Sequence, residues 1–237
     1  MNVALRPFAA GKDGTILIAG ERAVCDQRGV LFFPDLGLLV VSDLHLEKGS
    51  SLARRGVLLP PYDTVATLLR LQAIIADYSP RMVISLGDSF HDGGGSARLP
   101  ASFRDQLCAM MAGRDWFWVA GNHDPDAPAG LPGETVRELA IGGLVFRHEP
   151  SAVPVAGEIA GHLHPCARIV QRGRSVRRRC FASDGDRLVM PAFGSYTGSL
   201  NVLDRAYAGL FRWDAFVAYM LGSSRIFAIA GSMLRPG

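Results

Sequence analysis

The stretch LLVVSDLH, residues 38–45, is a short apolar run that leads directly into a polar loop. Three further runs have the same form, and all four are predicted to be buried strands that end at a loop: residues 38–42, 82–86, 116–120 and 158–160. Ligands bind beyond the carboxyl ends of the strands in open α/β sheets. The loops after these strands are therefore the first candidates for a functional site.

Helical periodicity fills the gaps between the first three strands. Residues 62–78 follow Pro60 and Pro61 and carry an apolar stripe formed by Val65, Leu68, Leu69 and Ile75. A second stripe recurs at helical spacing before the third strand, in Phe103, Leu107, Met110 and Met111. Short connections of this kind favour a parallel, right-handed βαβαβ unit.

From Val136 onward, short strands alternate with Gly, Asp and Ser turns, which predicts a second sheet that packs on the first. The expected fold class is α/β, with a two-sheet β-sandwich core flanked by helices in α/β/β/α layers. With 237 residues, of which 49% are hydrophobic and 20% charged, the chain suits a single domain spanning residues 1–237. Apolar residues near the end are expected to be core, with a contact in a homo-oligomer as the alternative: Leu210, Phe211, Trp213, Phe216 and Phe227.

Composition also limits the cellular setting. The start of the sequence, residues 1–12, has no signal-peptide pattern, and no apolar run approaches about 18 residues. A cytoplasmic protein without a membrane segment is therefore expected. The four cysteines are scattered without a Cys-x-x-Cys pair, which argues against a disulfide framework or a zinc knuckle.

All six histidines fall in five short segments that also contain carboxylates, an amide or glycines. The segments are Ser42-Asp43-Leu44-His45, Gly87-Asp88-Ser89-Phe90-His91, Gly121-Asn122-His123-Asp124, Arg147-His148-Glu149 and Gly161-His162-Leu163-His164. Any one of them alone is more typical of a turn or of a hydrogen-bonded core histidine than of a metal site. Their occurrence together, in this order, indicates one site to which all of them contribute.

Together these segments resemble the signature of the calcineurin-like metallophosphoesterases, which runs Asp-x-His, Gly-Asp, Gly-Asn-His-Asp/Glu, His and Gly-His-x-His. The resemblance implies the fold of that family and a site with two divalent metal ions. It implies that the first ion is bound by Asp43, His45 and His164. It further implies that the second is bound by Asn122, His148 and His162, and that the carboxylate of Asp88 bridges the two.

The residue types suit this chemistry. Imidazole, carboxylate and amide oxygen are ligands that fit Mn²⁺, Fe or Zn²⁺ better than calcium. The spacing of two between Asp43 and His45 puts both side chains on one face of an extended segment, and His162 and His164 share that spacing. Two ions about 3.5–4 Å apart can clamp the oxygens of an in-line displacement and generate a hydroxide near neutral pH. Metal-bound hydroxide is therefore expected to attack phosphorus.

Three residues of the segments are expected to act outside the ligand set. His123 is the histidine that the family does not use as a ligand, and it is expected to protonate the leaving oxygen or to stabilise its developing charge. Asp124 is expected to orient its ring, with a helix or turn cap as the alternative. The family pattern fixes no role for His91, which is expected to support a ligand or to contact substrate. Three residues after the first ligand pair are interpreted as exposed loop charges, with a place at the border of the phosphate pocket as the alternative: Glu47, Lys48 and Arg54.

A closer resemblance covers roughly residues 15–205. The stretches SDLHLEKGSS at 42–51, RRG at 54–56, LPPYDT at 59–64, GDSFHD at 87–92, GHLHP at 161–165 and PAFGSYTG at 191–198 look like the ligase-associated DNA-damage-response metallophosphoesterase family. That family is bacterial, and its members are described as manganese-dependent phosphodiesterases or single-strand DNA endonucleases. They are often encoded beside an ATP-dependent DNA ligase, a helicase and an exonuclease. The resemblance implies manganese as the metal, single-stranded DNA as the substrate and an association with those enzymes in DNA repair.

Six arginines cluster within twelve residues: Arg168, Arg172, Arg174, Arg177, Arg178 and Arg179. The cluster begins four residues after His164, so Arg168, Arg172 and Arg174 are expected to lie near the metals and to contact a nucleic-acid backbone. An arginine-rich surface hairpin is the alternative. Only 8% of the residues are aromatic, so phosphate contacts rather than base readout are expected.

Two other function classes fit the sequence less fully. The signature fixes the chemistry at phosphorus but not the groups attached to it, so a small-molecule phosphoesterase acting on a nucleotide or cyclic diester is the main alternative. A non-catalytic scaffold of this fold would be expected to lack ligands, whereas every ligand and His123 are present here.

Overall fold

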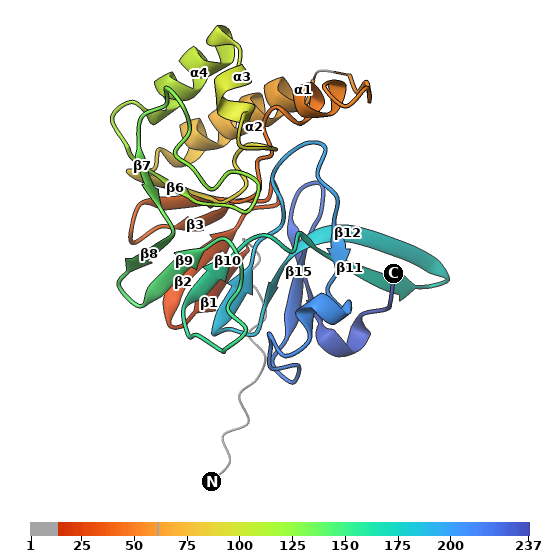
Figure 1. The fold of residues 1–237 in the computed structure, drawn as a ribbon. Coiled ribbons are helices and arrows are strands. Elements are labelled where there is room, and N and C mark those ends of the chain that lie inside the picture. The colour runs from red at the N-terminus through yellow and green to blue at the C-terminus, as the bar shows by residue number, and fades with distance from the viewer. Residues whose placement is uncertain (1–13, 61) are drawn as a thin grey trace.

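The computed structural model describes residues 14–60 and 62–237, so residues 1–12 and Pro61, on which part of the sequence analysis rests, lie outside the described residues. Figure 1 shows two layers of strands, with the helices gathered at the top of the view. The strands are β1 Thr15–Ile18, β2 Glu21–Cys25, β3 Leu31–Phe33, β4 Leu38–Val41, β5 Met82–Leu86, β6 Asp115–Val119, β7 Glu134–Val136, β8 Glu138–Ile141, β9 Leu144–Arg147, β10 Glu158–Ala160, β11 Pro165–Gln171, β12 Arg174–Ser183, β13 Arg187–Val189, β14 Leu200–Asn201, β15 Val217–Leu221 and β16 Ile226–Ala230. The helices are α1 Lys48–Ala53, α2 Asp63–Tyr78, α3 Gly95–Arg98 and α4 Ala101–Met111, with the 3-10 helices η1 Arg205–Tyr207 and η2 Gly231–Met233.

The first sheet has the order β1-β2-β3-β4-β5-β6-β7. Its strands β4, β5, β6 and β7 pair in parallel, which confirms the βαβαβ prediction. The sheet also contains three antiparallel strands before β4 that the sequence analysis did not identify. These strands are three to five residues long, so each is too short to develop a clear periodicity.

Helices α2 and α4 pack on the outer face of this sheet. Leu68 and Ile75 lie on the buried side of α2, as predicted, but Leu69 is 57% exposed, so its place in the predicted stripe is wrong. The buried side instead includes Thr67, whose hydroxyl donates to the main-chain oxygen of Asp63. A threonine whose hydroxyl is satisfied in this way can be buried like an apolar residue, and a hydrophobic pattern does not reveal it.

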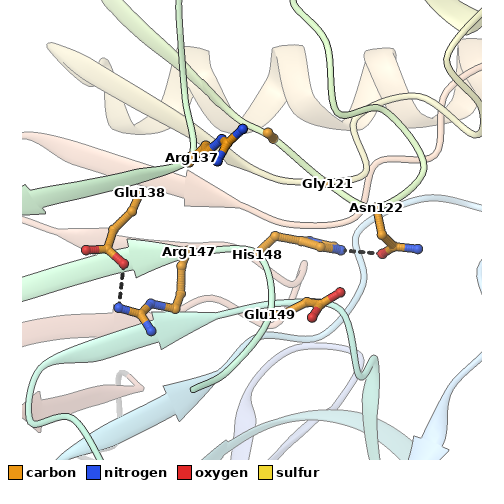
Figure 2. Close-up of a pocket in the computed structure, with 8 residues that line it drawn as sticks. Gly121, Asn122, Arg137, Glu138, Arg147, His148 and Glu149 are labelled. Atoms are coloured by element: carbon orange, nitrogen blue, oxygen red, sulfur yellow. Dashed lines mark hydrogen bonds and ion pairs between the residues drawn. The ribbon is translucent and has the colours of Figure 1, made fainter. Parts of the chain in front are cut away.

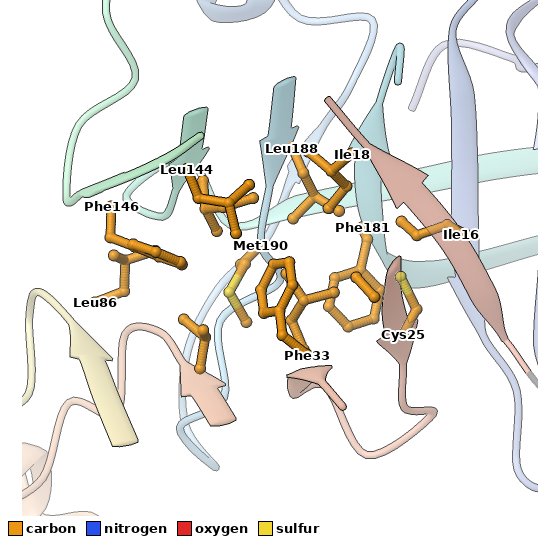
Figure 3. Packing of buried hydrophobic residues seen from close by; sticks show 14 of the residues in the cluster. Ile16, Ile18, Cys25, Phe33, Leu86, Leu144, Phe146, Phe181, Leu188 and Met190 are labelled. Carbon is orange, nitrogen blue, oxygen red and sulfur yellow. The ribbon is translucent and has the colours of Figure 1, made fainter. Parts of the chain in front are cut away.

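The second sheet has the order β14-β11-β12-β13-β10-β9-β8, and β15 and β16 extend it from β12. It packs on the first sheet as predicted, and the two share one buried apolar cluster. Figure 3 shows side chains from both sheets meeting there, Phe33 and Leu86 from the first and Phe146 and Phe181 from the second. The α/β fold class with a two-sheet core is therefore confirmed.

The outer face of the second sheet carries no α-helix in the described part of the chain, because all four α-helices fall within residues 48–111. The segment around η1 covers it instead, with Tyr207, Phe211 and Phe216 packed on small residues of the sheet. Phe211 and Phe216 thus belong to the core, as expected, whereas Trp213 and Phe227 are 41% and 42% exposed.

The described residues contain neither a membrane-spanning helix nor a disulfide. No helix among them combines the length and the apolar character that crossing a bilayer requires. All four cysteines are free, and burial raises the pKa of the Cys25 and Cys180 thiols well above the ordinary value. These two thiols therefore act as packing groups and not as nucleophiles.

Asp26 anchors the turn between β2 and β3 to the end of α2. Its buried carboxylate accepts hydrogen bonds from the main chain and guanidinium of Arg28 and from the hydroxyl of Tyr78. Burial alone would raise the pKa of Asp26, but the hydrogen bonds and charge of Arg28, together with the Tyr78 bond, outweigh it and lower the pKa. The folded protein therefore favours the ionised carboxylate.

Asp26→Asn is expected to lower the free energy of unfolding by about 2 kcal/mol at neutral pH, because a buried carboxylate that accepts from Arg28 and Tyr78 is replaced by an amide and Arg28 keeps only its exposed partner Asp77. The folded-state pKa of Asp26 lies below the unfolded value of about 3.9, so this contribution is present above that pH and is lost as pH falls through the folded pKa. Urea unfolding of the wild type and of Asp26→Asn, at pH values above and below about 3.9, measures this contribution to the free energy of unfolding. Asp35→Asn, which removes an exposed ion pair with Arg22, is the control, and an equal effect of the two changes would contradict the assignment.

Candidate metal centre

The segments rich in histidine lie at the carboxyl ends of five strands, β4, β5, β6, β9 and β10. The first three are parallel in one sheet and the last two are parallel in the other, so each sheet aligns the ends of its own strands. Main-chain hydrogen bonds tie neighbouring loops together: the amide of His45 donates to Asp88, and that of Gly161 donates to His148. The fold thus brings the side chains predicted as ligands into one cluster.

Asp43, His45 and His164 form the first group of convergent donor atoms. Nε2 of His164 lies 3.1 Å from Oδ1 of Asp43 and 3.4 Å from Nε2 of His45. Asp43 is fully buried, and no hydrogen bond of normal geometry reaches its Oδ1 among the described residues, although the ring of His164 lies close to it. A buried carboxylate oxygen without a partner is costly unless a cation or a proton compensates it, so this group fits a metal ion.

Asn122, His148 and His162 form the second group. Oδ1 of Asn122 lies 2.9 Å from Nε2 of His148, the contact dashed in Figure 2, and 3.0 Å from Nδ1 of His162. The two ring nitrogens are 3.2 Å apart. Atoms that share one ion through bonds of about 2.1 Å have separations of this size, so the three atoms fit a second ion.

Asp88 lies between the two groups. Its Oδ2 is 3.8 Å from Nε2 of His45, and its Oδ1 is 3.5 Å from Nε2 of His148. The amide of His123 also donates to Oδ1, at 2.9 Å. Burial opposes ionisation, but the hydrogen bond and charge of His148 dominate and lower the pKa of Asp88 to about 2. The carboxylate is therefore ionised at neutral pH and placed between two candidate cation sites.

The backbone of the cluster is strained. Five of the nine non-glycine residues with positive φ in the described chain belong to it: Asp43, His45, Asp88, His162 and His164, with φ between 44° and 66°. Such conformations cost about 1–3 kcal/mol each and persist only where the surroundings over-determine them. Their concentration here indicates that side-chain geometry at this cluster is maintained at the expense of local stability.

Two glycines allow the loops to approach this closely. A Cβ atom on Gly87 would lie 2.1 Å from Nδ1 of His148, and one on Gly161 would lie 2.1 Å from Oγ of Ser42. Both separations are far shorter than van der Waals contact, so a larger residue at either position would push a loop of the cluster away.

The fold and the cluster place the chain among known proteins. The calcineurin-like phosphoesterase family matches residues 36–179, more than half of the 237 residues. The chain belongs to the calcineurin-like phosphoesterase family. It is a metal-dependent phosphoesterase, as the sequence resemblance implied, and the clustered histidines and aspartates are its candidate metal-binding groups.

Two solved structures resemble this phosphoesterase. The crystal structure of the Pseudomonas putida nuclease MPE is 27% identical, with a TM-score of 0.71 over 91% of this chain and 98% of that chain. Yfce, a phosphoesterase from E. coli, is 15% identical, with a TM-score of 0.41 over 81% of this chain and 98% of that chain. The first similarity agrees with the closer family resemblance, while the second is too distant to carry an argument. No curated protein matches the chain.

In this phosphoesterase His123 is held by the main chain of His91 and not by Asp124. Its Nδ1 lies 2.9 Å from the carbonyl oxygen of His91, and because a carbonyl oxygen only accepts, Nδ1 carries the proton. Its Nε2 is 3.9 Å from Oδ2 of Asp88. The orienting role predicted for Asp124 is corrected, because its carboxylate accepts a hydrogen bond from the amide of Phe90 at 2.9 Å. That contact ties the loop after β6 to the loop after β5, so it is not the local helix or turn cap that was the alternative for Asp124.

His91 touches both a predicted ligand and the predicted acid. Its ring stacks on that of His123, with centroids 5.3 Å apart, and its Nδ1 lies 3.5 Å from Nδ1 of His45. Burial lowers the pKa of His91, and the charge of Lys48 acts in the same direction. His91 therefore lies inside the site as a neutral imidazole, outside the two groups of predicted ligands.

The arginine cluster lies on the hairpin of β11 and β12, which projects away from the helices in Figure 1. Arg172 follows His164 by eight residues, about 26 Å along an extended strand, so Arg172 and its neighbour Arg174 are remote from the predicted ligands. The guanidinium of Arg168 donates to the hydroxyl of Ser175 and to a main-chain oxygen near the end of the chain. The expectation that Arg172 and Arg174 border the metals is therefore wrong, and both lie on an exposed surface hairpin, which was the alternative. A role for Arg168 beside the metals stays a prediction.

The loop of residues 191–198 supports the first predicted ligand loop, a role that the sequence analysis did not assign. The amide of Gly194 donates to the main-chain oxygen of Asp43, at 3.0 Å. Arg70 donates to the main chain of Phe193 and lies over its ring, with its guanidinium carbon 3.9 Å from the centroid. Arg179, from the arginine cluster, also donates to the main chain of this loop. The only signal in the sequence was the recurrence of PAFGSYTG in the family resemblance.

Two of the clefts that border the cluster are each lined by two predicted ligands. One has a volume of about 370 Å³ and appears in Figure 2, and its lining includes Asn122, His148, Arg137, Glu138 and Arg147. The other has a volume of about 250 Å³ and lies beside residues 198–200, and its lining includes His162 and His164. Space is therefore available next to two different pairs of predicted ligands.

Gly87→Ala is expected to displace His148 and to lower the content of bound metal, with hydrolysis of bis(4-nitrophenyl) phosphate reduced at least about a hundredfold. Elemental analysis after loading with manganese and a rate assay measure this outcome. Gly93→Ala is the matched control, because a Cβ atom there meets no atom within 4 Å. Thermal unfolding of both variants separates loss of the site from loss of the fold, and normal metal content in Gly87→Ala would contradict the account.

Proposed function

We propose that this phosphoesterase is a manganese-dependent nuclease that cleaves single-stranded DNA in DNA repair. The proposal is supported by the closer family resemblance and by the similarity to a nuclease over nearly the whole of both chains. In that setting the protein acts alongside an ATP-dependent DNA ligase, a helicase and an exonuclease.

The placement of the two clefts is the observation that carries the proposal. One adjoins Asn122 and His148, and the other adjoins His162 and His164. A polymer continues on both sides of the phosphate that is cleaved, so it needs space on two sides of the metal ligands. A nucleotide or a small cyclic diester needs only one pocket that encloses it.

The two groups of donor atoms divide the ligands as the family resemblance implies. Asp43, His45 and His164 would hold one ion, and Asn122, His148 and His162 would hold the other, with the carboxylate of Asp88 between the two groups. Two divalent ions bound there would neutralise the phosphate and lower the pKa of the attacking water. Burial lowers the pKa of His45 to about 4 and keeps that imidazole neutral for binding. At His148 burial acts in the same direction, but the hydrogen bond and charge of Asp88 outweigh it and raise the pKa to about 9, so an ion bound there would have to displace a proton.

His123 supplies the proton for the leaving oxygen. Its Nδ1 proton is held by the carbonyl oxygen of His91, which leaves Nε2 to carry the proton that is transferred. The side chain is 40% exposed, so it can regain a proton from solvent after each turnover.

His123→Asn is expected to lower kcat on a single-stranded oligonucleotide by about 10²–10⁴-fold while leaving the manganese content unchanged. Bis(4-nitrophenyl) phosphate releases 4-nitrophenolate, which needs no protonation, so its hydrolysis is expected to fall much less. Steady-state rates on both substrates, with metal analysis of each preparation, make the comparison. Equal losses on the two substrates would show that His123 does not act as an acid.

Among combinations of divalent metal and substrate, Mn²⁺ with single-stranded DNA is expected to give the highest kcat/KM. The substrates compared are a single-stranded oligonucleotide, its duplex, a panel of nucleotides and a cyclic dinucleotide, with Asp88→Ala as the inactive control. A higher kcat/KM on a nucleotide or cyclic diester would overturn the proposal in favour of a small-molecule phosphoesterase.

A further inference from the structure

The segment that follows α1 presents large apolar side chains to solvent. Leu58 is 85% exposed and Tyr62 is 66% exposed. Arg54 and Arg55, which are also exposed, precede them in the chain. We call Arg54, Arg55, Leu58 and Tyr62 the α1 platform. Exposed apolar residues grouped in this way are typical of a binding surface.

Hydrogen bonds place the platform at the rim of the metal centre. Nζ of Lys48, at the start of α1, donates to the main-chain oxygen of Tyr196 at 2.9 Å. The hydroxyl of Tyr196 donates to the main-chain oxygen of Pro60 at 3.2 Å. Tyr196 belongs to the loop of residues 191–198, whose Gly194 amide donates to Asp43. The platform is thus connected to a predicted metal ligand through one loop.

The arginines of the platform are available to bind an anion. Neither the guanidinium of Arg54 nor that of Arg55 has a hydrogen-bond or ion-pair partner within residues 14–60 and 62–237. The neighbouring acids are all engaged: Asp92 with Arg98, Asp63 with the amide of Gly49, and Glu47, which is buried and not exposed as expected, with Thr64. The four cations of the rim, Lys48, Arg54, Arg55 and Arg98, exceed these three carboxylates by one charge, so the rim keeps a net positive charge.

We propose that the α1 platform binds the single-stranded polynucleotide beside the phosphate that is cleaved, with Arg54 and Arg55 on its phosphates and the ring of Tyr62 stacked on an unpaired base. This inference rests on the proposed nuclease function. Guanidinium groups pair with phosphates, and an exposed aromatic ring stacks on any unpaired base without sequence preference. The base faces of a duplex are already stacked on one another, so the platform also gives a physical reason for a preference for single strands.

The double variant Arg54→Ala/Arg55→Ala tests the phosphate contacts. KM for a single-stranded oligonucleotide is expected to rise about tenfold, and the slope of log(1/KM) against log salt is expected to become shallower by about 1.4 for two lost contacts. Arg172→Ala/Arg174→Ala, at the remote end of the β11–β12 hairpin, is the matched control. It removes the same charge and is expected to change neither quantity.

Tyr62→Ala tests the stacking contact. KM for the oligonucleotide is expected to rise about tenfold, whereas Tyr62→Phe, which keeps the ring, is expected to match the wild type. The side chain of Tyr62 makes no capping hydrogen bond to α2, so its truncation leaves the start of the helix intact.

Bis(4-nitrophenyl) phosphate has neither the neighbouring phosphates nor the bases that the platform is proposed to bind. Its hydrolysis therefore reports on the fold and the metal centre and is expected to be equal in all variants. If Arg54→Ala/Arg55→Ala keeps the wild-type KM and salt slope, or if Tyr62→Ala keeps the wild-type KM, the proposed binding of DNA by the platform is wrong. The nuclease proposal would not be affected by either result. Hydrolysis of the small diester without any cleavage of DNA by the wild type would overturn the nuclease proposal, and the platform with it.

Discussion

A buried carboxylate between two groups of histidines is the constraint on which the rest of the structure depends. Asp88 is 2% exposed, and a charge in such a place is stable only when donors or cations surround it. The groups around it come from His45, His123 and His148, on three different loops. The ends of the strands that carry these loops must therefore meet within a few ångströms. Parallel pairing within each sheet and face-to-face packing of the two sheets achieve this.

The apolar core compensates for the strain at the cluster. Positive φ at five predicted ligands opposes folding, while each fully buried aliphatic or aromatic side chain contributes about 1.5–3 kcal/mol to it. The anchoring residues stand directly before the strained loops, since Leu86 ends β5 just ahead of Asp88 and Ile159 lies in β10 just ahead of His162. Packing of the two sheets thus fixes the positions from which the strained loops depart.

The sequence predicts the gathering of the ligand segments well, because each lies within a few residues of a strand end and its spacing is local. The sequence does not predict the position of a side chain where that position depends on the tertiary arrangement of distant elements. Asp124 adjoins His123 in sequence, yet its carboxylate turns to the amide of Phe90. Arg172 is near His164 in number, yet an extended strand carries it away. The sequence contains no local signal for either outcome, since both depend on how distant loops and strands are arranged.

The groups that would act at phosphorus lie on the five ligand loops, whereas the rim that would contact the rest of the substrate is built by other segments of the chain. Ligand sets of this kind do not fix what is attached to the phosphate, so selectivity must come from the rim of the site. The rim is built by residues 54–60 and 191–198, joined by the bond from Tyr196 to Pro60, and both segments lie outside the five ligand loops. Its arginines divide into two kinds, because Arg70 and Arg179 hold the main chain of the rim, whereas Arg54 and Arg55 hold nothing that the structure describes. The first kind maintains the shape of the site, so only the second kind can change without disturbing the metal centre.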